Sequence, residues 1–157
     1  MNTDMTLQMH STSSGDTEAL GAKIGANLRG GEVIELISDL GGGKTTLTRG
    51  LVRGAGSKDR VASPTFTISR EYKAPSFTIA HFDFYRLGEA GIVADELAEL
   101  VGDPTYVVVV EWGDVAKDVL PAERLTIRLA QTANDERSIV CTCTPALEYV
   151  LQGVEAC

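Results

Sequence analysis

A glycine-rich segment that ends in a lysine and two threonines is the strongest candidate for chemistry in this sequence. Residues 38–46 read Ser-Asp-Leu-Gly-Gly-Gly-Lys-Thr-Thr. Consecutive glycines let the backbone turn its N–H groups inward, and a helix that starts there points its positive end at the same place, so the segment suits phosphate. Lys44 is expected to reach the β- and γ-phosphates of a nucleotide, and the Thr45 hydroxyl to bind the Mg2+ ion that bridges them.

The surrounding residues fit a phosphate-binding loop between a strand and a helix. Residues 33–37 form a short apolar run rich in β-branched side chains, and apolar residues recur at helical spacing over 47–52. Ser38 stands where the P-loop pattern has its first glycine, so a glycine-rich turn that binds no nucleotide is the alternative. The predicted nucleotide-binding residues are Asp39, Leu40, Gly41, Gly42, Gly43, Lys44, Thr45 and Thr46, with Thr46 taken as a helix residue rather than a second metal ligand.

A carboxylate at the end of an apolar strand is the second candidate for chemistry. Residues 106–110 read Tyr-Val-Val-Val-Val and are followed by Glu111. Because ligands of open α/β sheets lie at the carboxyl ends of the strands, Glu111 is predicted to emerge beside the phosphate-binding loop. There it can hold Mg2+ directly or through water, or polarise the attacking water. Two roles fit the next residue, Trp112: a wall of the nucleotide or partner site, or a purely structural tryptophan.

A loop with hydroxyl side chains follows the predicted phosphate-binding helix. Residues 63–66 read Ser-Pro-Thr-Phe, a turn that leads into an extended segment. In a nucleotide-binding protein, Thr65 can sense the γ-phosphate by offering its hydroxyl to Mg2+ or to the waters around it. Without a nucleotide, the same residues are only the entry to a strand.

Polar side chains alternate with phenylalanines along the predicted strand 76–84. His81 and Asp83 point to one face, and Tyr85 continues the same alternation, followed directly by Arg86. We expect the opposite face, with its phenylalanines, to be core and this face to carry chemistry. The alternative is a solvated face of an edge strand.

Length and composition indicate one soluble domain. The chain has 157 residues, 43% of them hydrophobic and 23% charged, which is enough to bury a core. The longest apolar run is too short to cross a bilayer, and the polar first 15 residues do not form a signal sequence, so we expect a cytoplasmic protein without membrane contact. The three cysteines form no metal-binding pattern; Cys141 and Cys143 alternate on one strand face and are expected to pack as small apolar groups.

Charge is distributed unevenly along the chain. The net charge of -8 argues against a surface that binds nucleic acid throughout, yet residues 44–86 contain eight basic and three acidic side chains. The triphosphate accounts for one or two of these cations. Two interpretations fit the excess: a solvated helix face and loop, or a docking surface for an acidic partner or an RNA backbone. The residues in excess are Arg49, Arg53, Lys58, Arg60, Arg70 and Lys73.

The remaining elements follow from periodicity and turn residues. We expect residues 1–14 to be a flexible leader and residues 15–157 to form a single domain. The predicted elements are a helix capped by Ser13 or Ser14 and running to Leu28, a hairpin of strands 66–72 and 76–84, a helix over 95–101, a hairpin of strands 125–129 and 138–144, and a short helix over 145–152.

Four motifs, in this order and spacing, resemble the TsaE (YjeE-type) family of P-loop ATPases. They are Asp39–Thr46, Ser63–Phe66, His81–Arg86 and Val110–Trp112. The resemblance extends over residues 17–129, and the His-x-Asp-x-Tyr-Arg and Glu-Trp motifs are more specific than the P-loop. It implies an α/β fold of the P-loop NTPase type, a three-layer sandwich in which helices flank a central mixed sheet, with hairpin strands added.

The resemblance also implies an activity. It is that of a Mg2+-dependent, partner-stimulated ATPase that assists formation of N6-threonylcarbamoyladenosine at position 37 of tRNAs that read codons beginning with adenine. The implied cofactors are ATP and Mg2+. The implied partners are proteins of the TsaB and TsaD type, and tRNA contact is expected only within their complex.

The family's motifs give each matching position a role. Lys44 and the loop backbone hold phosphates, while Thr45 and Glu111 serve Mg2+. The catalytic residues implied are Lys44, Thr65, Asp83 and Glu111, and the switch or partner residues around them are His81, Tyr85, Arg86 and Trp112. Ser38 and Gly42 depart from the glycine and alanine that are usual in the family, but no charged role is lost.

Two other functions stay open. One is a nucleotide-sensing subunit whose bound nucleotide sets partner affinity while hydrolysis is incidental. The other is a small P-loop kinase in which Asp83 is the base for an acceptor hydroxyl. The chain is short for the substrate lid that small-molecule kinases usually need, and it has no Asn-Lys-x-Asp element to support guanine selection.

Overall fold

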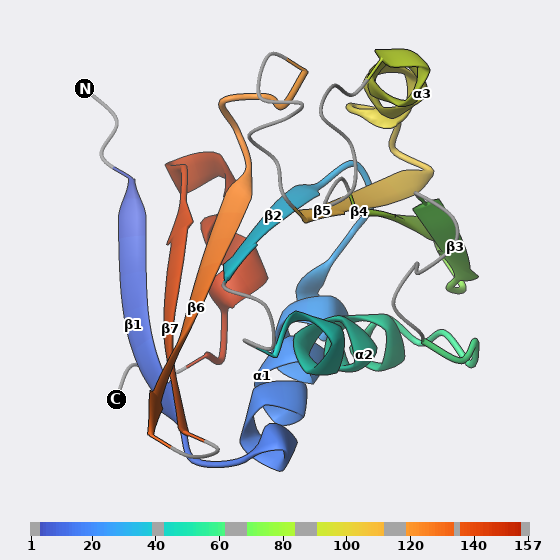
Figure 1. The fold of residues 1–157 in the computed structure, drawn as a ribbon. Helices are drawn as coiled ribbons and strands as arrows, with labels where there is room; N and C mark the ends of the chain where they lie inside the picture. The colour runs from blue at the N-terminus through green and yellow to red at the C-terminus, as the bar shows by residue number, and fades with distance from the viewer. Residues whose placement is uncertain are drawn as a thin grey trace.

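The computed structural model has one mixed sheet with helices on both of its faces (Figure 1). The structure describes residues 4–38, 43–61, 69–83, 91–111, 119–133 and 136–154, with the backbone alone for residues 91–94. In chain order the elements are β1 (Met5–Ser11), α1 (Ser14–Asn27), β2 (Val33–Ser38), α2 (Lys44–Gly54), β3 (Ser69–Lys73), β4 (Thr78–Asp83), α3 (Gly91–Leu100), β5 (Tyr106–Glu111), β6 (Leu125–Ala133), β7 (Glu136–Cys143) and the 3-10 helix η2 (Pro145–Leu151). None of the helices in these ranges combines the length and apolar character that a bilayer span requires.

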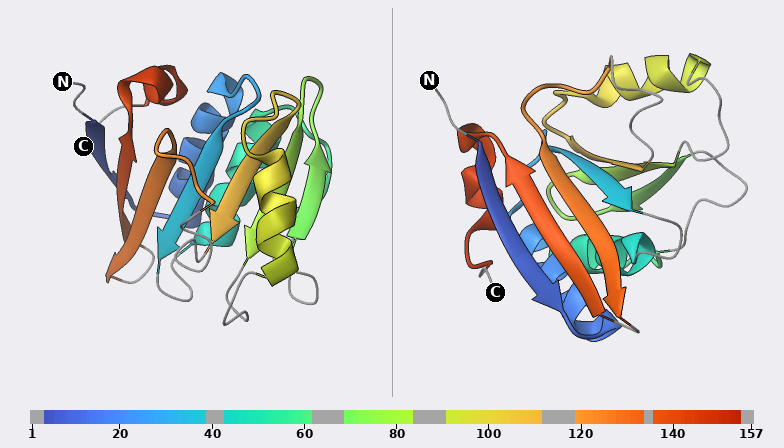
Figure 2. Two further views of the ribbon diagram at one scale, coloured as in Figure 1. Left: turned by 90° about the horizontal axis from the view of Figure 1, so that it is seen from above. Right: turned by 60° about the vertical axis from the view of Figure 1, so that its left-hand side comes forward.

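The sheet has seven strands in the order β1-β7-β6-β2-β5-β4-β3. The central strand β2 is parallel to both of its neighbours, β5 and β6, and β4 is parallel to β5. The outer pairs β1–β7, β7–β6 and β3–β4 are antiparallel. α1 and α2 lie on one face of the sheet and α3 on the other (Figures 1 and 2). The predicted three-layer α/β sandwich with added hairpins is confirmed, and β2, β4, β5 and β6 all end at one edge.

The core lies on both faces of the sheet, with β5 between its two halves. Val107 and Val109 pack with the α1 and α2 side chains, whereas Val108 and Val110 pack on the opposite face with Leu97 of α3. All four valines are at most 1% exposed. The continuous apolar run before Glu111 is therefore the pattern of a strand that is buried on both faces, as predicted.

The N-terminal segment is not the flexible leader that we expected. Met5–Ser11 forms β1, which pairs with β7 from Met5↔Cys143 to Ser11↔Arg137. The backbone pairing and the burial of Met9 hold the strand in place. Met5, Leu7 and Met9 alternate with polar residues, and this period-two pattern was the signal for a strand.

Strand β4 does not fit the alternative of a solvated edge-strand face. It is an internal strand between β3 and β5, and both of its faces are buried. His81 and Phe82 are each 1% exposed although they point to opposite faces. The face that carries His81 is thus neither solvated nor at an edge, and it is shielded by the helix layer of α1 and α2. The predicted antiparallel pairing of this strand with β3 is confirmed.

The limits of one helix and one hairpin differ from those predicted. The helix predicted over 95–101 starts at Gly91, and the last hairpin extends over Leu125–Ala133 and Glu136–Cys143 because backbone pairing continues beyond the apolar residues. The predicted packing of Cys141 and Cys143 is confirmed, since both are buried free thiols. Burial raises the pKa of Cys141 to about 12, so this thiol stays protonated at neutral pH.

A polar cluster attaches η2 to the turn between α1 and β2. The Tyr149 hydroxyl donates to Glu32 at 2.5 Å, and the Arg29 guanidinium lies 4.0 Å from the centre of the Tyr149 ring. Glu32 is only 4% exposed, and it also accepts hydrogen bonds from the backbone N–H groups of Arg29 and Gly30. Burial and the neighbouring carboxylate of Glu32 raise the pKa of Tyr149 to about 12.

Replacing Tyr149 by Phe is expected to lower the free energy of unfolding by about 1–2 kcal/mol, because the buried Glu32 carboxylate loses one donor. The pKa of Tyr149 in the folded protein is raised above its usual value near 10. The contribution of its hydrogen bond to the free energy of unfolding is therefore complete below pH 10 and declines as the pH rises toward 12. Urea unfolding of both proteins at several pH values measures this. A difference between them that grows above pH 10 contradicts the assigned contact.

Candidate functional site at the carboxyl ends of the parallel strands

The helix that follows the predicted phosphate-binding loop begins where the sequence places it. α2 starts at Lys44, directly after Gly43, whose φ of 99° lies in the left-handed region that favours glycine. Thr45 and Thr46 are half-buried in the first turn. Asp39, Leu40, Gly41 and Gly42 lie outside the described residues, so their contacts with a nucleotide stay predictions.

Lys44, Glu111 and His81 meet in one buried cluster. Lys44 Nζ lies 3.7 Å from Glu111 Oε1, and His81 Nε2 lies 2.5 Å from Glu111 Oε2. The three residues are 8%, 3% and 1% exposed, respectively. They come from α2, β5 and β4, and the sheet register sets His81 opposite Val109, two residues before Glu111. The predicted neighbourhood of Lys44 and Glu111 is therefore observed, with His81 as a third member.

The cluster explains how a carboxylate can be buried at this depth. An ionised carboxylate removed from water is costly unless a cation and hydrogen-bond donors compensate it. Lys44 supplies the charge, and His81 donates from Nε2 when Glu111 is ionised. Each oxygen of Glu111 thus has its own partner, and the side chain is held at the end of β5 in one orientation.

The other nitrogen of His81 has no comparable contact. Within the described residues, His81 Nδ1 is buried without a hydrogen-bond partner. The centroid of the Tyr72 ring lies 6.5 Å from the imidazole centroid. A buried acceptor without a partner costs about 1–3 kcal/mol.

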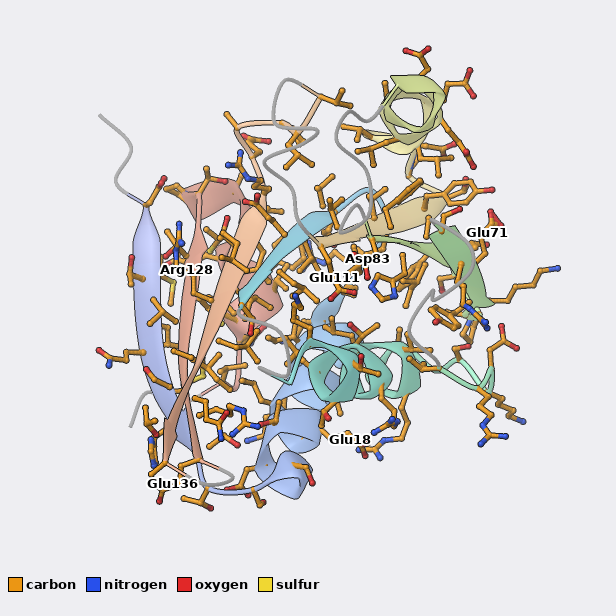
Figure 3. All side chains as sticks on the ribbon, in the orientation of Figure 1. Glu18, Glu71, Asp83, Glu111, Arg128 and Glu136 are labelled. Carbon is orange, nitrogen blue, oxygen red and sulfur yellow. The ribbon has the colours of Figure 1, made fainter. Side chains whose placement is uncertain are left out.

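Asp83 lies beside this cluster. It is the last residue of β4, and the register sets it opposite Glu111 on the neighbouring parallel strand. Figure 3 shows the two labelled carboxylates close together at the ends of their strands. Asp83 is half-buried and two residues from His81, so both side chains point to the same face. The structure thus brings together four of the predicted site residues, namely Lys44, His81, Asp83 and Glu111.

The donor atoms of this region suit Mg2+ better than a transition metal. Carboxylate and hydroxyl oxygens are the ligands that Mg2+ prefers, and Glu111 and Thr45 offer one of each. Among the described residues, no group of three or more His, Cys, Asp or Glu side chains is arranged to hold a metal.

Four other predicted site residues lie outside the described part of the chain, so their roles stay predictions. They are Thr65, Tyr85, Arg86 and Trp112.

Among the basic residues, Arg49 and Arg53 of α2 both pair with Glu18 of α1. They are nevertheless at least half exposed. The pairing favours the interpretation of a solvated helix face for these two.

Arg137 is a residue near the site that sequence analysis missed. It comes from the start of β7, and its Nε lies 3.7 Å from the position that a Cβ on Gly43 would occupy. No motif links residues 43 and 137, because their proximity depends on the register of the β6–β7 hairpin against the sheet.

Comparison with protein families gives a match over most of the chain. The family model described as "Threonylcarbamoyl adenosine biosynthesis protein TsaE" matches residues 11–139. The chain belongs to the TsaE family. The match begins in β1 and ends in β7, so it includes all the elements that position Lys44, His81, Asp83 and Glu111.

Individual TsaE proteins are similar over most of the chain. The protein named tRNA threonylcarbamoyladenosine biosynthesis protein TsaE from Bacillus subtilis is 37% identical over 131 residues, which is 81% of this chain and 79% of that protein. The protein of the same name from Streptomyces coelicolor is 39% identical over 134 residues, 78% of this chain and 87% of its own length. The crystal structure of YdiB from Bacillus subtilis matches with a TM-score of 0.78 and 31% identity, covering 97% of this chain and 95% of that one.

Proposed function

We propose that this protein binds MgATP and hydrolyses it in support of N6-threonylcarbamoyladenosine formation at position 37 of tRNA, together with partners of the TsaB and TsaD type. Membership of the TsaE family supports the pathway. The observation that carries the ATPase is the buried Lys44–Glu111–His81 cluster at the edge where the parallel strands end. A lysine that starts the helix after a glycine-rich segment, facing a strand-end carboxylate, is the arrangement of phosphate-hydrolysing P-loop sites.

The residues at this site have different roles in binding and hydrolysis. Lys44 binds the β- and γ-phosphates and exchanges its contact with Glu111 for one with the phosphates. The nearby hydroxyl of Thr45 and the carboxylate of Glu111 are the protein ligands proposed for Mg2+. When bound, Mg2+ neutralises charge that develops on the β- and γ-phosphate oxygens.

Glu111 and Asp83 are the two groups that can orient the attacking water. The contact with His81 at 2.5 Å fixes the orientation of the Glu111 carboxylate, so a water that hydrogen-bonds to it is held in a defined position. Asp83 lies opposite it on β4 and can contact the same water or a second one. Positioning of this kind, rather than covalent chemistry, is the main contribution of a protein to phosphoryl transfer.

Phosphate release from ATP tests the proposal. The purified chain is expected to release phosphate slowly, and faster once its TsaB and TsaD counterparts are added. Lys44→Ala is expected to reduce the stimulated rate by about 100-fold or more, because the phosphates lose their main cation. The kinase alternative predicts a phosphorylated acceptor in place of free phosphate. If partners do not stimulate release although ATP binds, the sensing alternative replaces the ATPase.

A further inference from the structure

Four basic side chains near the outer edge of the sheet have no part in the mechanism above. Lys58 and Arg60 lie in the connection between α2 and β3, and Arg70 and Lys73 lie in β3, the last strand in the sheet order. All four are exposed, and together they are called the basic edge below. Their charge has two possible explanations: a solvated surface, or a docking surface for an acidic partner or an RNA backbone.

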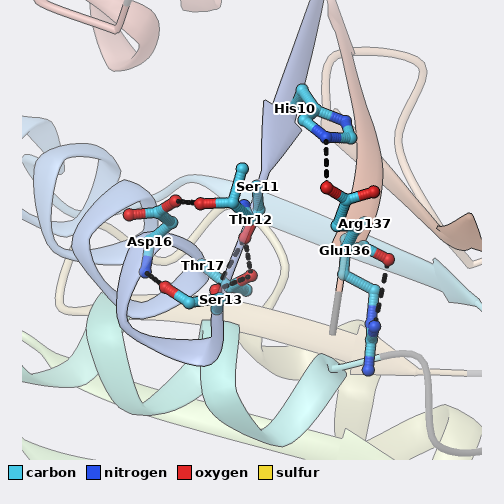
Figure 4. Close-up of polar contacts among 8 residues, drawn as sticks. All are labelled: His10, Ser11, Thr12, Ser13, Asp16, Thr17, Glu136 and Arg137. Carbon is cyan, nitrogen blue, oxygen red and sulfur yellow. Dashed lines mark hydrogen bonds and ion pairs between the residues drawn. The ribbon is translucent and has the colours of Figure 1, made fainter. Parts of the chain in front are cut away.

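Many basic side chains in the rest of the described chain contact a carboxylate, a carbonyl or an aromatic ring. They are Arg29, Lys44, Arg49, Arg53, Arg124 and Arg137. Figure 4 shows one of them, since Arg137 donates to the carbonyl of Glu136, whose carboxylate lies 3.7 Å from His10. Within the described residues, by contrast, the side chains of the basic edge form no ion pair and no hydrogen bond. Unpaired positive charge is therefore concentrated there.

Backbone contacts hold the basic edge together. Asp59 Oδ2 accepts a hydrogen bond from the backbone N–H of Lys73 at 2.7 Å, which attaches the α2–β3 connection to the end of β3. The Ser57 hydroxyl accepts from the backbone N–H of Asp59 at 3.1 Å, and Ser57 is only 8% exposed. Gly56 packs on the next turn, where an added Cβ would lie 3.1 Å from the ring of Pro75. The cations on either side of Asp59 and the one on Lys73 thus belong to one preorganised surface.

Two carboxylates lie among these residues without neutralising them. Asp59 accepts the backbone hydrogen bond from β3. Glu71, labelled in Figure 3, stands opposite Ala80, which belongs to the core on the α3 side, so its neighbour Arg70 points to the other face of β3. Arg70 and Lys73 are three residues apart on a strand, a distance of about 10 Å. The positive charge therefore forms a row, which suits a ligand with repeated negative charges.

The composition of this surface favours an RNA backbone over a protein partner. Protein interfaces are centred on buried aromatic or apolar side chains and are depleted in lysine. Over residues 55–61 and 69–76, no exposed residue is aromatic or large and apolar. Contacts to phosphates, in contrast, are made by Lys and Arg side chains and are independent of base sequence.

We infer that the basic edge contacts the sugar–phosphate backbone of tRNA. The inference rests on the proposed function, because that function brings tRNA to this chain within the complex with TsaB- and TsaD-type partners. Four phosphate contacts are fewer than the roughly six to ten of proteins that hold a nucleic acid tightly. The chain alone is therefore expected to bind tRNA at low salt and to depend on its partners at higher salt.

Fluorescence anisotropy of a labelled, unmodified tRNA transcript measures this contact with the full chain. Binding is expected at about 50 mM salt and is expected to be about tenfold weaker at about 100 mM, because four phosphate contacts give a slope of about -3 in log K against log salt. Lys58→Gln combined with Arg60→Gln is expected to weaken binding at the lower salt at least tenfold. The slope is expected to fall by about one for each cation removed.

Lys23→Gln combined with Arg128→Gln is the matched control. It also removes one lysine and one arginine that are exposed and lack a described partner, but these lie in α1 and β6 (Figure 3 labels Arg128). This variant is expected to bind tRNA within about threefold of wild type. Phosphate release from ATP by the chain alone is expected to be unchanged in both double variants, since their residues lie outside the Lys44–Glu111–His81 cluster.

The possible results distinguish this inference from the proposed function. If the wild type does not bind tRNA at low salt, or if both double variants bind it equally, the inference is wrong while the ATPase proposal stands. If Lys58→Gln/Arg60→Gln binds tRNA normally but no longer binds the TsaB and TsaD counterparts, the ligand is an acidic protein surface and the RNA assignment is wrong. If tRNA binding depends on the basic edge but the wild type releases no phosphate with its partners, the ATPase proposal fails while the tRNA contact stands.

Discussion

Replacing Glu111 by Gln is expected to lower partner-stimulated ATP hydrolysis by about 100-fold or more while MgATP still binds. The amide keeps the size of the side chain but loses the charge that holds Mg2+ or orients water, a contribution that is typically 100-fold to 10,000-fold. Lys44 also loses its ion pair with the carboxylate 3.7 Å away, so phosphate binding no longer requires that this pair be broken. Affinity for ATP without Mg2+ is therefore expected to equal or exceed that of the wild type. Phosphate release and isothermal titration measure the two effects.

Glu35→Gln is the matched control for this experiment. Glu35 is also a buried strand glutamate, 5% exposed, but it pairs with Arg124 and not with the site. Hydrolysis by this variant is expected within about threefold of wild type once its folding has been checked by circular dichroism. If Glu111→Gln hydrolyses ATP at the wild-type rate, the proposed role of Glu111 is wrong. Asp83, which stands opposite Glu111 on the neighbouring strand β4, is then the residue that orients the water.

The parts of the site that could be predicted from the sequence are those marked by a strong local pattern of residue types. The apolar run before Glu111 predicts a strand buried on both faces, and the glycine-to-lysine transition predicts the start of α2 at Lys44. Each pattern is complete within about ten residues. That Glu111 and Lys44 lie close together follows from one general rule, that parallel strands end at a common edge of the sheet.

The parts that could not be predicted depend on register between distant strands. The contact of His81 with Glu111 requires β4 to pair with β5 so that His81 stands opposite Val109, and no local pattern fixes that register. Likewise, Arg137 approaches Gly43 only because of the way β7 pairs with β6. Strand β1 was missed because its polar positions hide a short alternation that becomes meaningful only beside β7.

The close packing of α1 on α2 is a further feature that only the structure shows. Each helix carries two glycines four residues apart, Gly21 and Gly25 in α1 and Gly50 and Gly54 in α2. A Cβ added at Gly50 would lie 2.1 Å from the carbonyl oxygen of Glu18, and one at Gly25 would lie 2.2 Å from that of Leu51. The helix backbones are therefore in direct contact, and the atoms that a side chain would meet are backbone atoms that cannot rotate away.

Gly50→Ala is expected to lower the free energy of unfolding by about 3 kcal/mol or more. Alanine favours the helical state by about 1 kcal/mol over glycine, but overpacking at a rigid contact costs about 1–3 kcal/mol and occasionally more. A contact of 2.1 Å with a backbone carbonyl is expected to cost as much as the upper end of this range or more, because α2 must move away from α1 to relieve it. Chemical denaturation measures the loss directly, and a decrease in Tm of roughly 6–12 °C is expected for a chain of this size.

Gly15→Ala separates this clash from the general effect of removing a glycine. Gly15 lies in the exposed first turn of α1, and a Cβ there would meet only the Ser13 hydroxyl at an ordinary 3.6 Å. The free energy of unfolding of Gly15→Ala is expected to equal that of the wild type or to exceed it by up to about 1 kcal/mol, since alanine lowers the entropy of the unfolded chain. Because α2 carries Lys44, the displacement in Gly50→Ala is also expected to weaken MgATP binding, whereas Gly15→Ala leaves it intact. Equal stability of the two variants would show that α1 and α2 can separate freely, and that the glycine contact does not hold the phosphate-binding helix in place.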